Sequence, residues 1–494
     1  MKKSQPDPAL ESPIPFRTGC NGEFAPRPET SKDRLAERTF RDRVTERARK
    51  LGISRREFVG SVLGTTTALG VINTVYGCGS ESGAGGAGGT GAGGYGVGGD
   101  MMDPDEQCEV VEGHEFIFDV QTHHVNPDGA WRRNNPGLES LLTFLPQGSC
   151  DDSMDPIGCY DIDHYLREMF VNSDTSVAVL SALPGPTQAN GLEPDEMAAT
   201  MEMVNTLADS KRSVIHAIVH PENGMSELDG MQQLAEDHPV GAWKIYTPVG
   251  GYRLDDPAVG IPFLEKAREL GVTTICAHKG LTLPGFDPLY AEPDDVGVVA
   301  PMFPDVNFVI YHSAYETDVV EGPYDPMGAG IDRFIKAMLD HGVSPGQNVY
   351  AELGTTWRQL MTKPVEAQHA IGKLLLYFGE DRVVWGTDSI WYGSPQDQIA
   401  AFRAFSISEE LQETHGYPAL TDEVKAKIFG LNSAALYGID PDAKLCEIAE
   451  DDISQQKQAM RTIPALRRPS LRNMGPRTRQ EWLDFLRVND GKPG

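Results

Sequence analysis

The sequence predicts an α/β fold, a (β/α)8 or TIM barrel, with a disordered N-terminal leader, a Gly-rich linker and a helical C-terminal extension. Two observations predict the barrel. From residue 115 onward, short runs rich in Val, Ile and aromatic residues alternate with longer segments of helical periodicity, which is the pattern of repeated βα units. Eight such runs occur over about 270 residues, the ordinary size of one barrel.

The expected strands are the short apolar runs at residues 115–121, 175–182, 213–219, 241–246, 272–278, 306–312, 347–352 and 382–387. Helices are expected between them, for example at 262–270 and 330–342. Residues 395–439 are interpreted as closing helices, and "KAKIFGLNSAALYGID" predicts a helical hairpin. The barrel domain is therefore expected at 108–440, and a polar, helical extension at 441–494.

The composition favours a small-molecule substrate. The chain has 494 residues and a formal net charge of -29. So acidic a surface repels nucleic acid and anionic membrane surfaces at long range, which argues against both as partners. A hydrophobic content of 40% is enough for a sizeable core.

The N-terminal region resembles a bacterial twin-arginine export signal. Ser54, Arg55, Arg56 and Phe58 match its pattern and precede a moderately apolar run without acidic residues. "VYGC" ends in Cys78 and looks like a lipoprotein cleavage box, and a flexible Gly-rich stretch follows. These features predict a disordered leader at 1–53, a signal at 54–78 and a linker at 79–107.

The export signal implies several further expectations. The twin-arginine machinery would be a partner, and the mature protein would be periplasmic, or anchored on the outer side of the inner membrane through lipidated Cys78. An oxidising compartment would permit one disulfide among Cys108, Cys150 and Cys159. The pair is left open, as is the alternative of free or buried thiols. Cys276 is expected in the core.

Polar residues stand at the ends of the expected strands, and in barrels of this type the strand carboxyl ends form the active face. Histidine and carboxylate are the donors that zinc or another divalent transition metal prefers, with coordination left open for water. Each residue alone is weak evidence, but their joint occurrence predicts a site. They are His123, Lys244, His278, His312, Glu352 and Asp388.

The motifs resemble those of the metal-dependent amidohydrolase superfamily, in the branch that contains aminocarboxymuconate semialdehyde decarboxylase. They occur in the order "FDVQTHHV", "ICAHKG", "FVIYHSA", "VVWGTDSIW" and "IFGLNSAALYGID" between residues 115 and about 440. The resemblance implies His123 and His278 as metal ligands. It implies Asp388 as a ligand that also hydrogen-bonds the metal water, and His312 as the acid or base beside that water.

Gln121 stands where the family has its first histidine. Residues two apart on a strand face the same side, so Gln121 and His123 should both face the site and His124 should point away. Three alternatives follow: a weaker metal site that includes the Gln121 oxygen; three ligands, His123, His278 and Asp388, with Gln121 orienting water; or loss of the metal.

The expected function is hydrolysis of a lactone, ester or amide by water activated on a divalent metal, zinc first, with manganese or cobalt as alternatives. The same groups could decarboxylate an aromatic or unsaturated acid, and a metal-free barrel that binds a ligand without turnover is a third alternative. Lys244, Lys279, Arg358 and Trp391 are expected to bind substrate, although the cations could equally be solvated surface residues. A homodimer is a further expectation.

Overall fold

The computed structural model describes residues 11–17, 28–77, 93–144, 155–186, 188–282 and 286–461. Its centre is one eight-stranded parallel sheet in which each strand pairs with the next strand along the chain. All eight expected strands are confirmed, with ends shifted by a few residues. They are β2 (Phe118–Thr122), β3 (Val177–Ser181), β4 (Ser213–Ile218), β5 (Val240–Ile245), β6 (Thr274–His278), β7 (Asn307–Tyr311), β8 (Val349–Glu352) and β9 (Val383–Val384).

The first and last strands close the sheet into a barrel. The Val120 amide donates to the Trp385 carbonyl at 3.0 Å, and the Asp388 amide donates to the Gln121 carbonyl at 2.9 Å. The buried Asp119 carboxylate strengthens the closure, because it accepts a 3.1 Å hydrogen bond from the Thr387 amide across the seam. Desolvation raises the pKa of Asp119 to about 7 despite these donors.

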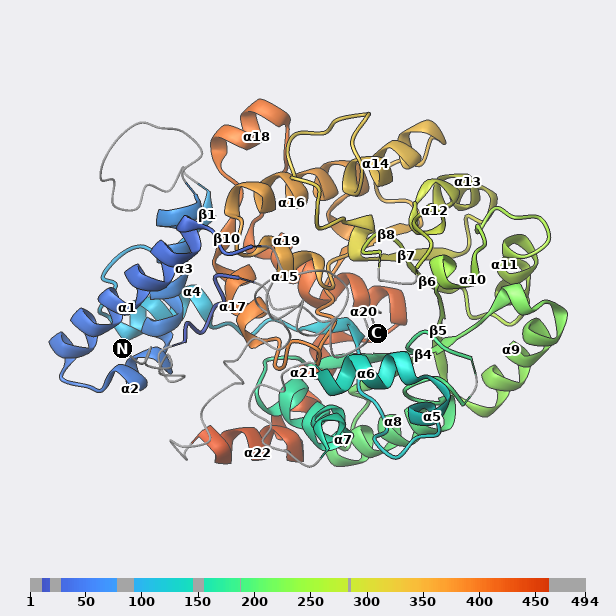
Figure 1. Cartoon of the computed structure of the whole chain (residues 1–494), viewed down its shortest axis with the longest axis horizontal. Coiled ribbons are helices and arrows are strands. Elements are labelled where there is room, and N and C mark those ends of the chain that lie inside the picture. The colour runs from blue at the N-terminus through green and yellow to red at the C-terminus, as the bar shows by residue number, and fades with distance from the viewer. Residues whose placement is uncertain are drawn as a thin grey trace.

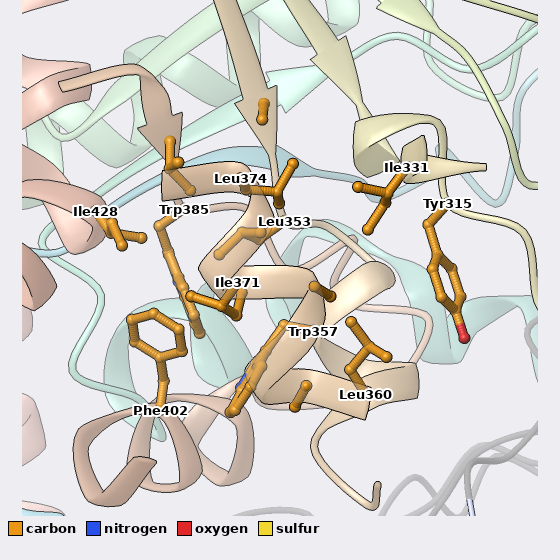
Figure 2. Close-up of a cluster of buried hydrophobic side chains, with 14 of the residues drawn as sticks. Tyr315, Ile331, Leu353, Trp357, Leu360, Ile371, Leu374, Trp385, Phe402 and Ile428 are labelled. Carbon is orange, nitrogen blue, oxygen red and sulfur yellow. The ribbon is translucent and has the colours of Figure 1, made fainter. Parts of the chain in front are cut away.

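Helices surround the barrel (Figure 1). Their apolar faces pack on the strands, as in α14, whose Phe334, Ile335 and Met338 are buried. Figure 2 shows this packing beside β9, where Trp357 and Phe402 meet edge to face with ring centroids 5.0 Å apart. The helices after each strand are α5 (Trp131–Asn134), α6 (Pro136–Phe144), α7 (Ile162–Leu166), α8 (Pro194–Ala208), α9 (Met225–Asp237), α10 (Thr247–Gly250), α11 (Gly260–Glu269), α12 (Pro288–Ala291), α13 (Asp294–Met302), α14 (Ile331–Asp340), α15 (Thr356–Leu360), α16 (Pro364–Phe378), α17 (Gln396–Ala404), α18 (Glu409–His415), α19 (Asp422–Ala426) and α20 (Asn432–Tyr437).

The predicted helical hairpin near the end of the barrel is wrong. A π-helical turn at Lys427–Leu431 joins α19 to α20, and the helix ends at Gly438, whose left-handed conformation caps it. Gly430 is not a turn glycine: a Cβ there would lie 2.1 Å from the Phe116 carbonyl oxygen, so the glycine allows the helix to approach the chain just before β2.

The C-terminal extension continues as α21 (Pro441–Glu450) and α22 (Asp452–Arg461), and the rest of the predicted extension lies outside the described residues. A buried ion pair ties it to the barrel, since Arg212 Nη1 lies 2.8 Å from Asp451 Oδ2. Arg212 also donates to the carbonyls of Ser176 and Thr175, so its buried charge is fully engaged.

The N-terminal region differs from its prediction. We call residues 31–76 the N-terminal helical unit; it comprises α1 (Ser31–Leu51), α2 (Arg55–Val59) and α3 (Val62–Tyr76). The expected disorder of residues 1–53 is therefore wrong for 31–51. Within the expected linker, β1 (Gly94–Tyr95) pairs with β10 (Phe405–Ser406) of the barrel domain, and α4 (Pro104–Val111) follows. Figure 1 shows these blue helices beside the barrel.

Several sequence features of this region lie outside the described residues, among them Cys78 and most of the Gly-rich stretch. No helix in the described part of the chain is long and apolar enough to span a membrane. Cys159 forms a disulfide, whereas Cys108 and Cys276 are free thiols.

Candidate active site

The ends of β2, β6, β7 and β9 bring the predicted residues together in a buried cluster at the barrel mouth. His123, His278, His312 and Asp388 are each at most 2% exposed. His123 Nε2 lies 3.1 Å from Asp388 Oδ1, and the rings of His278 and His312 meet edge on with centroids 4.7 Å apart.

Asp388 is the most heavily hydrogen-bonded member of the cluster. Gln121 Nε2 donates to its Oδ1 at 3.1 Å, and the Thr355 hydroxyl donates to its Oδ2 at 2.6 Å. Thr355 also lies 3.2 Å from the Tyr392 hydroxyl. Sequence reasoning missed Thr355, although its place just after an expected strand, in "AELGTT", was a signal that could have found it.

His123 is held in one tautomer and one orientation. Its Nδ1 lies 2.7 Å from the Ser181 carbonyl oxygen, an atom that can only accept, so Nδ1 carries a proton. The Trp391 ring stacks on the imidazole at 5.5 Å with a 16° angle between the planes. His124 points away, as expected, and its Nε2 lies 3.0 Å from the Thr200 hydroxyl.

His312 stands on a left-handed turn that a buried carboxylate stabilises. Glu352 Oε2 accepts a hydrogen bond from the His312 amide at 2.8 Å, and the Ser313 hydroxyl donates to the Glu352 carbonyl at 2.7 Å. Desolvation raises the pKa of Glu352 to about 8. Glu352 thus shapes the turn that presents His312.

The His312 imidazole leaves one nitrogen for chemistry. Nδ1 lies 2.8 Å from the Gly354 carbonyl oxygen and so carries the proton. Nε2 therefore bears a lone pair, and it is buried without a hydrogen-bond partner within the described part of the chain. Burial, opposed by the Gly354 bond, lowers the pKa of His312 to about 3.

Lys244 on β5 places a buried cation beside these histidines. Its side chain is 0% exposed, and its Nζ lies 3.7 Å from the Tyr311 ring centroid and 4.3 Å from that of Tyr246. Tyr246 in turn stacks on His278 at 5.4 Å. The Lys244 charge contributes to lowering the pKa of both His278 and His312, after the larger effect of burial.

Two predicted substrate-binding cations are held in buried ion pairs. Lys279 is fully buried and pairs with Asp295 at 2.8 Å, while its Nζ also donates to the Tyr290 carbonyl. Arg358 is buried and pairs with Asp397. The two charges thus serve ion pairs, and neither residue is the solvated surface cation of the alternative interpretation.

The backbone at the barrel mouth occupies conformations that L-residues seldom adopt. His312, Thr355 and Asp388 have φ values of 65°, 53° and 60°. Each such residue costs on the order of 1–3 kcal/mol and persists where the surroundings hold it, most often at functional sites. Three of them lie together at the barrel mouth, which makes this mouth the candidate functional site.

The residues present do not fit a metal site as the sequence predicted it. In the described ranges, no group of three or more His, Cys, Asp or Glu side chains is arranged to hold a metal ion. His123 and Asp388 form a pair, but His278 Nε2 lies 3.1 Å from the Leu281 carbonyl oxygen and thus donates there. Gln121 turns its amide nitrogen, which cannot ligate a cation, toward Asp388.

The family model for amidohydrolases matches residues 157–439, more than half of the chain. The chain belongs to the amidohydrolase family. His278, His312 and Asp388 lie inside the matched region, whereas Gln121 and His123 precede it. No curated protein matches the chain.

Solved structures with a similar fold include three that this chain covers almost completely. A 5-carboxyvanillate decarboxylase from Sphingomonas paucimobilis is 13% identical, with a TM-score of 0.41 over 66% of this chain and 99% of its own. A 2,6-dihydroxybenzoate decarboxylase from Rhizobium is 15% identical, with a TM-score of 0.38 over 66% of this chain and 99% of its own. A zinc-bound amidohydrolase from Burkholderia multivorans is 14% identical, with a TM-score of 0.38 over 66% of this chain and 100% of its own. Similarity at this level says nothing about the reaction of this chain.

Proposed function

We propose that this protein is a hydrolase that cleaves a lactone, ester or amide, with His312 as the general base. The observation that carries the proposal is the buried Nε2 lone pair of His312, which the Gly354 carbonyl bond fixes in position and which is not consumed by another described residue. A neutral imidazole nitrogen of this kind is the commonest proton acceptor in enzymes.

The proposed reaction follows from these residues. A water molecule beside His312 forms a bond from its oxygen to the substrate carbonyl carbon as its proton passes to Nε2. The carbonyl electron pair moves onto oxygen, where the buried Lys244 ammonium supplies positive charge. When the carbonyl re-forms, the bond to the leaving oxygen or nitrogen breaks, and His312 returns the proton to that atom.

Decarboxylation is the second candidate, and Lys244 is the observation that favours it. A buried ammonium is suited to hold a substrate carboxylate, and the proton between His123 and Asp388 could then be delivered to carbon as carbon dioxide leaves. The two candidates differ in the group that moves the proton. Hydrolysis depends on His312, whereas decarboxylation depends on the His123–Asp388 pair.

A substrate screen separates these candidates. The purified full chain would be offered lactones, aryl esters and amides, and separately aromatic and dienoic carboxylic acids, while acid release and carbon dioxide are both recorded. Acid release without carbon dioxide supports the hydrolase, and carbon dioxide from an acid supports the decarboxylase. Saturable binding of a panel compound without either product supports a binding barrel and contradicts both.

Export remains a separate proposal. It rests on the residue pattern around Arg55 and Arg56 and on the possibility of lipid attachment at Cys78. Fractionation of cells that express the full chain, compared with an Arg55→Lys, Arg56→Lys variant, tests it: periplasmic or membrane-bound protein that is lost in the variant is the expected result.

A further inference from the structure

The Asp388 carboxylate collects contacts from the side chains around it, His123 among them, while Gln121 Oε1 is buried without a hydrogen-bond partner in the described part of the chain. Asp388 receives Gln121 Nε2 at 3.1 Å on one oxygen and the Thr355 hydroxyl at 2.6 Å on the other. The orientation of the Gln121 amide follows from electrostatics, because turning it over would place its oxygen against a carboxylate oxygen. A cation between these residues would meet an N–H group where a ligand atom is needed.

His123 and Asp388 are paired directly in this structure. His123 Nδ1 already donates to the Ser181 carbonyl, so only its Nε2 faces the carboxylate, at 3.1 Å. That is the distance of a hydrogen bond. Two ligand atoms of one ion, each about 2 Å from it, also lie roughly 3 Å apart, so the case against a metal rests on Gln121 and His278 and not on this distance.

His278, the third predicted metal ligand, makes other contacts in the structure. His278 Nε2 lies 3.1 Å from the Leu281 carbonyl, one ring face stacks on Tyr246, and its edge meets His312. These contacts come from three different elements, so they fix the ring more firmly than one bond would. His278 is thus a packed, hydrogen-bonded wall of the site.

The positive charge that such a site needs is already present in the chain. Lys244 is completely buried, and two tyrosine rings cradle its ammonium group. Tyr311 is itself held by its hydroxyl, which donates to the Val120 carbonyl at 2.8 Å. The cation therefore sits on fixed supports inside the barrel, next to the histidines.

We propose that this chain has no resident divalent metal: Gln121 donates a hydrogen bond to the Asp388 carboxylate that also pairs with His123, and Lys244 supplies the positive charge of the site. The residue that sets this state is Gln121, because histidine at the same place would add an imidazole nitrogen to those of His123 and to the Asp388 carboxylate. The inference does not rest on the proposed reaction, since metal content can be measured without a substrate.

Metal analysis of the full chain, expressed in medium supplied with zinc, manganese and cobalt, tests the proposal. We expect wild type to carry far less than one metal ion per chain, and Gln121→His to gain about one. Gln121→Asn is the matched control and should stay metal-free. Near-stoichiometric metal in wild type that is lost in His123→Gln, but kept in the neighbouring His124→Gln, would overturn the proposal.

A second measurement covers the case in which Gln121→His folds poorly. The melting temperature of wild type would be followed while zinc is added. An ion that binds the folded state would raise the melting temperature in a saturable way. We expect no such rise, because wild type should not bind zinc. A saturable rise that His123→Gln removes contradicts the proposal. A well-folded Gln121→His that takes up no metal contradicts the role given to Gln121.

Discussion

The barrel mouth and the N-terminal helical unit differ in the kind of contact that each contains. The mouth buries charged and polar side chains, Asp388 and Lys244 among them, and carries several left-handed residues, all of which cost folding energy. The N-terminal helical unit buries mainly apolar side chains such as Phe40 and Leu69, and α1 and α2 begin with hydrogen-bonded caps. The difference is the one expected if the mouth serves the proposed chemistry and the unit serves stability.

The largest expected effect is on activity at the mouth. His312→Gln should lower kcat/KM by roughly 10²–10⁴-fold, the usual contribution of a general base, and should leave the melting temperature nearly unchanged. His369→Gln, a remote histidine bonded to Tyr417, is the matched control and should keep full activity. Equal losses in both variants would mean that His312 acts only through the fold.

The second effect should appear in stability alone. Phe40 is 1% exposed and lies in the interface of α1 with the rest of the unit, so Phe40→Ala should lower the free energy of unfolding by about 3–5 kcal/mol. Leu35→Ala, at a position on the same helix that is 46% exposed, should cost far less. Denaturant unfolding measures both. Similar small losses in both variants would show that the unit is not docked.

These two regions also show which features could be predicted from sequence. All eight strands were found because each is a short run rich in apolar residues, and the mouth residues were found because each lies at or just after the end of such a run. The expected disorder of residues 31–51 was wrong, since α1 is a helix there, whereas the export signal at 54–78 stays a prediction. The apolar stretch that resembles an export signal has the composition that a buried helix also requires. The pattern of α3 therefore fits both interpretations and does not distinguish them.

A signal for α1 was nevertheless present. Ala36, Phe40, Val44 and Ala48 recur every four residues and all face inward, which is the spacing of a buried helical stripe. The roles of Lys279 and Arg358, in contrast, could not be read from sequence. Their partners Asp295 and Asp397 lie 16 and 39 residues away, and only the tertiary fold brings them together.

The third prediction concerns the ion pairs that join the barrel domain to its flanking segments. Asp174 accepts ion pairs from Arg403 and Lys457, and Arg403 also holds Glu115. Burial alone would raise the pKa of Asp174, but the charges of Lys457 and Arg403 outweigh it and hold the pKa well below its ordinary value. Asp174 therefore adds stability at neutral pH that is lost as the pH falls below about 4, once the unfolded chain binds the proton first.

Asp174→Asn is the variant that isolates this contribution. It should lower the free energy of unfolding by about 2 kcal/mol at pH 7, in the range of hydrogen bonds to charged groups, and it should flatten the loss of stability between pH 5 and pH 2. Denaturant midpoints across that pH range measure both changes. A variant that loses stability in acid as steeply as wild type would assign the acid sensitivity to other carboxylates.

The smallest effect concerns the first turn of α1, and it bears most directly on whether the N-terminal helical unit is folded. The Thr30 hydroxyl accepts from the Asp33 amide at 3.2 Å, and the Asp33 carboxylate accepts from the Thr30 amide at 2.7 Å. The other Asp33 oxygen accepts from the Tyr76 hydroxyl at 2.7 Å, so the cap also joins α1 to the end of α3. Thr30→Ala should cost about 1 kcal/mol.

Because that loss is local, hydrogen exchange of α1 amides is the sharper measurement. Thr30→Ala should speed exchange in α1 and leave the barrel strands unchanged, while Thr30→Ser, which keeps the hydroxyl, should behave as wild type. Fast α1 exchange already in wild type would mean that α1 does not stay docked, and the stabilising role given to the unit would fail while the chemistry assigned to the mouth would stand.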